Sequence, residues 1–440
     1  MEQVNIISAK IKNFASFKDE SEALFLAESK YHSISNKDWN LISHNSLDDD
    51  DKILPVTAIY GANASGKSNF LEAISSIKNL MGRGEKADNH NIKTNPFTLD
   101  KKSQEKNTLI ELEFIIDNTR YLFVVEYNST EIVFEKLSSL NKDNNENSYY
   151  NRKAENGSPT LEFDTDLLLD NEFKKKGING EILLIPKRSD VLALESMSSA
   201  DLLIAKKIYN FIKELKILVD FKNETMLEKI KNNNKIKSQV LSFLKSADTG
   251  IVDIKIKKGS ELGIDLLKLP KNMPTELKER IIKDISEDFF VKFIHSGEDF
   301  SGAVPKESDG TDAYFNILLS ILPAFIDGGI FIVDELERSL HPMLIKQVVD
   351  LFHNKKINKA GAQLIFTTHN TSLLNQDILR RDEILFAEKD FDGTSRIYPL
   401  SELNGIRASE DLEKNYIKGK YGAVPFLGNI KDLEKLFKEV

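Results

Sequence analysis

Cysteine is absent from the 440-residue sequence, and so is any long apolar run. Without cysteine the chain has neither disulfide bonds nor cysteine-ligated zinc sites, and it suits a reducing compartment. No apolar stretch approaches the roughly 20 residues of a membrane-spanning helix. The N-terminal residues MEQVNIISAKIKNF alternate like a β-strand and show no apolar segment of the signal-peptide kind. We therefore expect a soluble, cytoplasmic protein.

Positive charge is also scarce, because 60 lysines and arginines face 69 aspartates and glutamates, which gives a net charge of −9. This balance argues against a uniformly basic nucleic-acid-binding protein. The charge is unevenly distributed, since residues 201–245 contain ten lysines and only five acidic residues. Either this segment meets phosphates, or it is an exposed helical arm whose lysines are simply solvated.

Strand and helix patterns alternate near both ends of the chain, and the middle is mainly helical in pattern. Buried strands are predicted at 56–61, 329–335 and 363–369, and helices at 69–82, 341–353 and 275–290. Further strands are predicted three times within 108–137, once in 251–267 and twice in 383–400, and residues 138–160 form a polar loop or a hairpin. A helix in 200–245 has an apolar face that runs from Ile204 to Leu218.

This order of elements predicts one α/β core that is split by a long insertion. We assign residues 1–165 to the N-terminal half of the core, 166–290 to a mainly helical insertion or arm, and 291–440 to the C-terminal half.

The clearest motif, GANASGKSN at 61–69, has the Gly-x-x-x-x-Gly-Lys-Ser pattern of a phosphate-binding loop. It follows a buried strand and opens a helix, which is the context that the motif requires. Backbone N–H groups wrap the phosphates, Lys67 reaches the β- and γ-phosphates, and Ser68 presents its hydroxyl to Mg²⁺. The predicted nucleotide-binding residues are Gly61, Ala62, Asn63, Ala64, Ser65, Gly66, Lys67, Ser68 and Asn69.

Two further strands end in residues that suit catalysis. In GGIFIVDELERSLHP at 328–342, four apolar residues lead to Asp334 and Glu335. At the end of a buried parallel strand, Asp334 would hold Mg²⁺ beside the phosphate loop, and Glu335 would polarise the attacking water. QLIFTTHN at 363–370 places His369 at the same sheet edge, where it would sense the γ-phosphate.

The stretch ESDGTDAYFNILLSIL at 307–322 has the features of a helix start. Ser308 can accept backbone N–H bonds as an N-cap, and the apolar residues that follow recur at helical spacing. A hydroxyl and Gly310 at a helix N-terminus form an anion site. The chain would then have a second anion site far from its phosphate loop.

Phosphate loop, Ser-x-Gly, Asp-Glu strand and His strand, in this order, resemble the ATP-binding-cassette ATPases. In that class the signature motif of one subunit caps the γ-phosphate that is bound by the other. The resemblance thus assigns Ser308, Gly310 and Thr311 to the partner's ATP. Only the Ser and the Gly of the usual Leu-Ser-Gly-Gly-Gln align, with Asp309 between them. The glutamine that these ATPases place after an early strand has no counterpart that we assign.

The long stretch between phosphate loop and signature resembles the branch that contains the SMC, RecF and OLD-type ATPases. The N-terminal IKNFASFKD at 11–19 resembles the first strand of that branch and implies that Lys12 and Asn13 lie near the nucleotide. GANASGKSN, ESDGT, DELERSLHP, TTHNTSLL and the tail DLEKNYIKGKYGAVPF together resemble the abortive-infection AAA-type ATPases of bacteria, the AbiLi/RloA group.

The resemblance implies a P-loop ATPase head that uses ATP and Mg²⁺ and closes head to head as a dimer or a higher even-numbered oligomer. It would act as the sensor of an antiphage system and control a separate, nuclease-like effector. Two alternatives stay open: a DNA-repair or DNA-end-binding ATPase with nucleic acid as its partner, and a nucleotide-stabilised scaffold that sequesters an effector. The aromatic and basic tail either contacts a partner or nucleic acid, or packs on the core as a terminal turn.

Overall fold

The computed structural model describes residues 3–28, 39–83, 91–155, 158–164, 168, 186, 188–218, 224–261, 273–295, 308–338, 340–407 and 409–425. The chain divides into two compact units. The first consists of residues 1–219, 327–337 and 346–440, and the second of residues 220–326 and 338–345.

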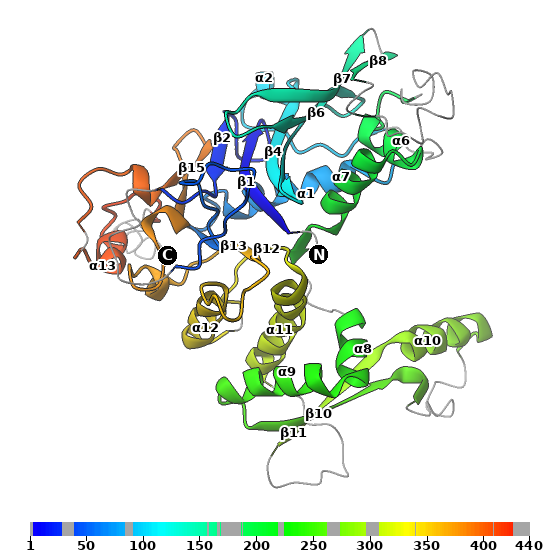
Figure 1. The fold of residues 1–440 in the computed structure, drawn as a ribbon, viewed down its shortest axis with the longest axis vertical. Helices are drawn as coiled ribbons and strands as arrows, with labels where there is room; N and C mark the ends of the chain where they lie inside the picture. The colour runs from blue at the N-terminus through cyan, green and yellow to red at the C-terminus, as the bar shows by residue number, and fades with distance from the viewer. Residues whose placement is uncertain are drawn as a thin grey trace, which may run out of the picture. The chain divides into compact units, whose positions relative to one another are not determined.

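A six-stranded sheet in the order β15-β14-β3-β13-β12-β9 forms the centre of the first unit (Figure 1). Its strands are β3 (Val56–Tyr60), β9 (Lys216–Leu218), β12 (Ile330–Val333), β13 (Gln363–Thr367), β14 (Ile384–Lys389) and β15 (Ser395–Pro399). All neighbours are parallel except β15, which pairs antiparallel with β14. Strands β3, β12 and β13 are buried along their whole length, which agrees with their mainly apolar sequences. Their carboxyl ends meet at one sheet edge.

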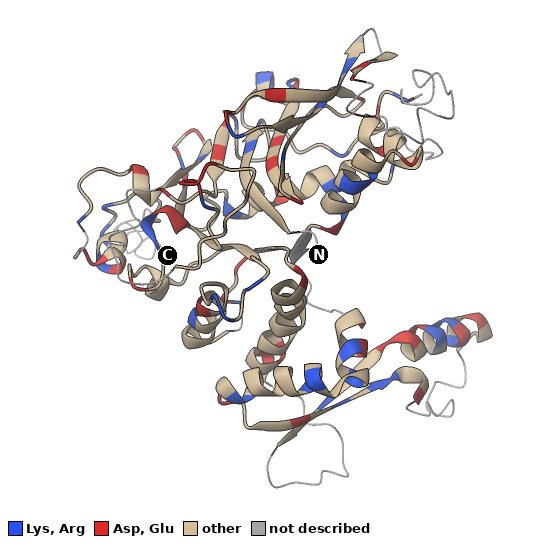
Figure 2. Ribbon diagram, viewed as in Figure 1, with Lys and Arg blue, Asp and Glu red and all other residues tan. Residues whose placement is uncertain are grey.

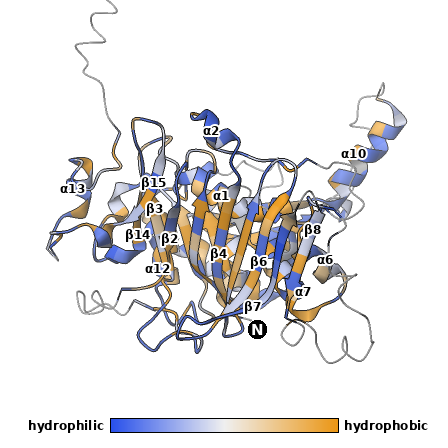
Figure 3. Cartoon of the chain, turned by 90° about the horizontal axis from the view of Figure 1, so that it is seen from above, coloured by the Kyte–Doolittle hydropathy of each residue, from blue (hydrophilic) through white to orange (hydrophobic). Residues whose placement is uncertain are grey.

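A seven-stranded antiparallel sheet in the order β2-β1-β4-β5-β6-β7-β8 completes this unit. Its strands are β1 (Val4–Lys12), β2 (Ser21–Leu24), β4 (Thr108–Ile116), β5 (Thr119–Tyr127), β6 (Ile132–Leu140), β7 (Glu146–Glu155) and β8 (Ser158–Phe163). Buried and partly exposed residues alternate along β4 from Thr108 to Glu113, as the sequence predicted, and the sheet carries both apolar and polar colours (Figure 3). The polar stretch at 138–160 forms the end of β6 and the hairpin of β7 and β8.

One apolar core joins both sheets to three helices of the first unit. Helix α1 (Lys67–Leu80) contributes Phe70, Ile74 and Ile77, which are fully buried. Helices α6 (Ala193–Ser199) and α7 (Leu203–Glu214) contribute Met197, Ile208 and Ile212 to the same core. Two short helices, α2 (Lys101–Gln104) and α13 (Leu412–Ile417), lie elsewhere in this unit.

The helical insertion therefore differs from the predicted span of 166–290. Residues 193–218 belong to the first unit because α6 and α7 pack on its core, and the second unit begins only at Asp220. The buried Glu135 of β6 fixes this arrangement, since its carboxylate accepts hydrogen bonds from the N–H groups of Ala193 (2.7 Å) and Leu194 (2.9 Å) at the start of α6.

The predicted helical face from Ile204 to Leu218 is wrong at its C-terminal end. Helix α7 stops at Glu214, and Lys216–Leu218 form β9 at the edge of the central sheet. The register pairs Phe331 of β12 with Lys216. Backbone hydrogen bonds to an open strand edge thus override the helical spacing of the side chains.

The second unit contains α8 (Glu224–Asn232), α9 (Asn234–Ser246), α10 (Thr275–Glu287) and α11 (Asp309–Asp327), with the antiparallel pair β10 (Ile251–Lys258) and β11 (Phe289–His295). Helix α12 (Pro342–Phe352) is shared between the two units. None of the helices in the described ranges combines the length and the apolarity needed to cross a membrane.

Candidate functional site

The loop between β3 and α1 carries the predicted phosphate-binding residues. Strand β3 ends at Tyr60, and α1 begins at Lys67 with Gly66 as its N-cap. Gly66 has a φ of 110°, and a Cβ there would lie 2.6 Å from Ser395 Oγ, so only glycine fits. No side chain caps the helix, and the N–H groups of its first turn are available to an anion.

Lys67 is held inside this loop by the loop's own backbone. Its Nζ donates to the carbonyl oxygens of Gly61 (2.9 Å) and Ala62 (3.0 Å). Burial lowers the pKa of Lys67, and the nearby carboxylate of Asp334 acts in the opposite direction. A cation held in this way is already positioned for phosphate oxygens and has little rotamer freedom left to lose on binding.

Asp334 directly follows β12 and faces the start of α1, as the sequence predicted. Ser68 Oγ donates a hydrogen bond to Asp334 Oδ1 at 3.0 Å. Thr367, the last residue of β13, donates from Oγ1 to the same oxygen at 2.6 Å. The parallel pairing of β12 with β13 brings Thr367 and Asp334 together, and the sequence analysis did not identify Thr367.

Glu335 has a strained backbone and an exposed side chain. Its φ is 52°, which is uncommon for a residue other than glycine. Its N–H donates to Thr367 Oγ1 at 2.7 Å, so the same hydroxyl fixes both Asp334 and Glu335. Strain of this kind persists only where neighbouring groups enforce it, and it concentrates at functional sites.

His369 lies two residues beyond β13, at the same sheet edge. Glu337 accepts a hydrogen bond from the His369 backbone N–H, and the Tyr60 hydroxyl donates to the carbonyl of Asn370 at 3.2 Å. Burial lowers the pKa of His369 and the positive charge of Lys67 lowers it further, while the nearby carboxylates, Glu337 first, act in the opposite direction. Glu337 is a second residue that the sequence analysis did not identify.

A small cavity of about 110 Å³ unites these groups. It is lined by the loop from Asn63 to Asn69, together with Glu335 and His369. The structure thus brings together the loop, the Asp-Glu strand and the His strand from three distant parts of the sequence. The cavity offers N–H donors and a lysine from the loop, together with the carboxylate of Glu335 and the imidazole of His369.

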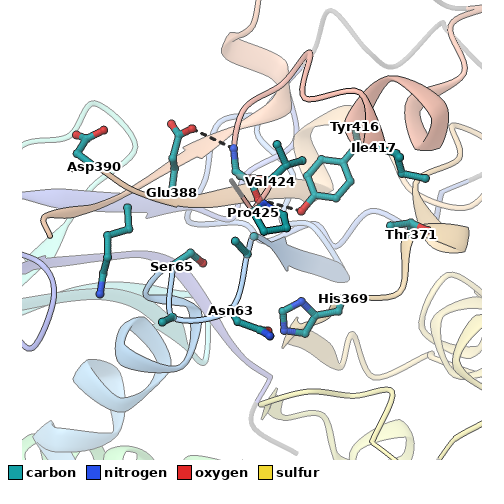
Figure 4. Close-up of a pocket in the computed structure, with 15 residues that line it drawn as sticks. Asn63, Ser65, His369, Thr371, Glu388, Asp390, Tyr416, Ile417, Val424 and Pro425 are labelled. Carbon is teal, nitrogen blue, oxygen red and sulfur yellow. Dashed lines mark hydrogen bonds between the residues drawn. The ribbon is translucent and has the colours of Figure 1, made fainter. Parts of the chain in front are cut away.

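A larger cavity of about 750 Å³ opens beside the same loop, and the C-terminal tail forms one wall (Figure 4). The loop side consists of residues 61–65, and His369 and Thr371 border both the loop and the tail. The tail contributes Tyr416, Ile417, Ala423, Val424 and Pro425. The Thr371 hydroxyl donates to Glu413 Oε1 of α13 at 2.6 Å, which ties the His369 segment to the tail.

The tail packs on the core, which is one of the two alternatives that the sequence left open. Tyr416 and Tyr421 are buried, and their rings stack on Phe386 with centroids 5.5 Å and 5.9 Å away. Glu388 accepts a hydrogen bond from the N–H of Ala423 at 3.0 Å (Figure 4). The tail is therefore a structural part of the cavity wall. Nothing in the sequence placed it next to the phosphate loop.

Asn13 lies outside the linings of both cavities, so its assignment to the nucleotide stays a prediction that rests on the resemblance. Asn13 is buried, and its side-chain amide donates to the carbonyl oxygens of Ser103 (2.9 Å) and Lys106 (2.8 Å). Lys12 is likewise absent from both cavity linings. Ser16 in the same segment does reach the loop, because Asn69 donates to its hydroxyl at 2.8 Å.

The predicted signature residues lie in the second unit, at the start of α11. Ser308 is the N-cap, as predicted, because its Oγ accepts the Thr311 N–H at 3.1 Å. Gly310 and Thr311 belong to the first turn of the helix. The lysine-rich stretch at 201–245 is split: α7 belongs to the first unit, where Lys207 pairs with Asp117, and α8 and α9 belong to the second.

The oxygen donors at the loop fit Mg²⁺. The Ser68 hydroxyl and the Asp334 carboxylate are the hard oxygen ligands that this ion prefers, and they lie within hydrogen-bond distance. No group of three or more histidines, aspartates or glutamates in the described residues could hold a metal. This donor set suits an ion that takes its remaining ligands from water and substrate phosphates.

The sequence matches one family model over residues 56–375, described as "AAA domain, putative AbiEii toxin, Type IV TA system". The chain belongs to this AAA family. The matched residues include the phosphate loop, Asp334, Glu335 and His369, so the family match covers the whole of the small cavity. The comparison with curated proteins returned no match.

Two solved structures show weak similarity to this AAA-family chain. The SMC head domain from Thermotoga maritima is 15% identical, with 90% of this chain and 98% of that chain covered and a TM-score of 0.36. The recombination mediator protein RecF is 14% identical, with the same coverages and a TM-score of 0.32. These TM-scores are too low to bear on the assignment, which follows from the motifs, the strand order and the family match.

Proposed function

We propose that this AAA-family chain binds Mg-ATP at its phosphate loop and hydrolyses it to ADP and phosphate. The proposal rests on the hydrogen bond between Ser68 and Asp334, next to Lys67. Glu335 follows Asp334, and a hydrogen bond from its N–H holds its backbone at a positive φ. This arrangement supplies the two parts that phosphoryl transfer requires, which are positioning and electrostatic stabilisation.

Each residue has a distinct role in the proposed reaction. Lys67 and the N–H groups at the start of α1 bind the phosphates. Ser68 and Asp334 would hold Mg²⁺, which neutralises charge that develops on the phosphate oxygens. Glu335 accepts a proton from the attacking water, and its exposed side chain lines the small cavity where that water would enter. The His369 ring would donate or accept one hydrogen bond at the γ-phosphate end.

Glu335→Gln tests the assignment of the base. We expect turnover to fall by roughly 10²- to 10⁴-fold while ATP still binds, because the amide cannot take the proton. Turnover by phosphate release and binding by a fluorescent ATP analogue should be measured together. Glu402→Gln, at an exposed position outside both cavities, is the matched control and should behave like wild type. Unchanged hydrolysis in Glu335→Gln would remove Glu335 from the mechanism.

We further propose that the chain is the ATP-dependent sensor of a bacterial antiphage system, of the AbiLi/RloA kind. ATP would close two heads against each other, and the closed state would control a separate nuclease-like effector. The family description, which names a putative AbiEii toxin and a toxin–antitoxin system, supports a place in such a system. A plating assay with phage, using this gene and its neighbour, tests the role; protection that persists in Glu335→Gln would favour a scaffold instead.

The trans role of Ser308 has a decisive test. In one mixed dimer a Lys67→Ala chain is paired with a Ser308→Arg chain, so that in the trans arrangement one site holds both defects and the other is intact. In a second dimer, wild type is paired with a chain that carries both changes, and each trans site then holds one defect. We expect turnover only in the first dimer. Turnover only in the second would assign Ser308 to its own chain's ATP.

A further inference from the structure

The two-stranded sheet of the second unit has one covered face. Ile254 and Ile256 of β10 are buried, and the ring of Phe293 in β11 packs edge-on against Phe315 of α11, with centroids 5.0 Å apart. The register places Ile254 opposite Phe293, so these residues share the inner face. Alternation along a strand then directs the residues between them to the opposite face.

The outer face combines lysines with an exposed aromatic ring. Lys255 and Lys257 alternate with the buried isoleucines and are exposed. In β11, Lys292 lies directly opposite Lys255, and Phe290 lies directly opposite Lys257. Phe290 is 42% exposed although it is one of the most apolar residue types. Figure 2 shows lysine and arginine positions along β10 and the neighbouring α9.

This composition is unfavourable for a face that only meets water. An exposed phenylalanine gains nothing from burial and adds to the risk of aggregation. The one acidic residue in this stretch of β10, Asp253, is already paired with Lys237 of α9 at 2.7 Å. Glu261, a second carboxylate close to Lys257, is paired with Lys231 of α8, so both of these carboxylates already face another lysine.

We propose that this face, defined by Lys255, Lys257 and Phe290, binds single-stranded nucleic acid. The lysines meet the phosphates, since successive outward residues of one strand lie about 6.8 Å apart and can follow an extended backbone. The phenylalanine ring stacks on an unpaired base, an interaction that every base can make. A paired base hides its faces from such a ring, so the exposed aromatic favours a single strand over a duplex.

The charge contribution is tested with the full chain and a labelled oligothymidylate, by fluorescence anisotropy over a series of salt concentrations. Wild type should bind at low salt. In Lys255→Gln/Lys257→Gln, the slope of log affinity against log salt should become shallower by about 1.4, because two fewer counterions are released. Lys355→Gln/Lys356→Gln removes the same charge at exposed positions of the first unit and should leave the slope unchanged.

The ring is tested separately. Phe290→Ala should weaken binding by roughly 5- to 100-fold with the salt slope unchanged, and Phe290→Tyr should restore it, because tyrosine keeps the stacking surface. Melting curves of each variant confirm that the fold is intact. Absence of binding by wild type at low salt would overturn the proposal, and so would equal binding of a duplex or an affinity that does not depend on Phe290.

Discussion

Ser68 and Asp334 lie 266 positions apart in the sequence, and a hydrogen bond of 3.0 Å joins their side chains. Thr367 donates a second hydrogen bond to the same oxygen of Asp334, and its hydroxyl also accepts the N–H of Glu335. One threonine thus positions the proposed metal ligand and the proposed base. The organisation of the site depends on the last residue of β13, which carries no chemistry of its own.

Thr367→Val should therefore impair hydrolysis through position alone. The change keeps the shape but leaves the Glu335 N–H without its acceptor, which costs roughly 1–3 kcal/mol. We expect lower turnover and lower stability, and Thr367→Ser should restore both. Thr57→Val is the matched control, because Thr57 is equally buried in neighbouring β3 and its hydroxyl has no hydrogen-bond partner. Equal effects of the two valines on turnover would contradict the bridging role of Thr367.

Lys67→Ala should lose ATP affinity without loss of the fold. Charge-assisted hydrogen bonds contribute about 1.5–3 kcal/mol, so binding should weaken by roughly 10- to 150-fold. Since burial disfavours the charged lysine, the melting temperature without nucleotide should not fall. Calorimetric titration with ATP and a melting curve provide the two measurements. Lys78→Ala, on the exposed side of the same helix, is the control; a similar loss there would point to the helix and not to the lysine.

The lowered pKa of His369 predicts a pH dependence of stability. Because burial disfavours its protonated form, the folded chain binds this proton more weakly than the unfolded chain does. The stability that the neutral ring contributes is fully present above pH 6.5, the usual pKa of histidine. It is lost as the pH falls through the lowered pKa of the folded state. Wild type should therefore lose more stability between about pH 7.5 and 5.5 than His369→Asn does.

Urea unfolding at both pH values measures that difference, and groups other than His369 cancel in the comparison. If the free energies of unfolding of His369→Asn and wild type change by the same amount between the two pH values, folding does not lower the pKa of His369.

Gly422→Ala should disrupt the tail wall of the larger cavity. Gly422 has a φ of 73°, and a Cβ there would lie 2.6 Å from the Tyr398 hydroxyl and 2.7 Å from Glu388 Oε1. These groups hold the tail through Tyr421 O and Ala423 N, at 2.8 Å and 3.0 Å. Gly405→Ala carries the same conformational cost of about 1–2 kcal/mol, but its Cβ meets nothing within 4 Å. Urea unfolding should show a larger loss of stability for Gly422→Ala than for Gly405→Ala. Equal losses would mean that the tail shifts to accept the Cβ and that the close contacts of Gly422 do not matter for stability.

The sequence alone determined the chemistry of the phosphate loop and the elements around it. GANASGKSN specifies a local backbone, since Gly66 permits a positive φ and Lys67 and Ser68 open a helix at once. The apolar runs that end in Asp334 and in Thr367 specify buried strands, and parallel strands bring their carboxyl ends to one edge. These patterns are local, and the folded structure keeps the elements that they predict because the core needs apolar residues at the same positions.

Only the tertiary structure decided which residues serve these motifs. Thr367 and Glu337 gain their roles through the pairing of β12 with β13, and no spacing in the sequence expresses that register. Lys216–Leu218 continue a helical pattern but become a strand, because the edge of β12 offers unpaired backbone groups. Asn13 lies three positions before Ser16, which contacts Asn69, yet the amide of Asn13 donates its hydrogen bonds to the backbone carbonyls of Ser103 and Lys106. Local pattern fixes a side chain's chemistry, while its partners depend on contacts between distant segments, which form only in the folded chain.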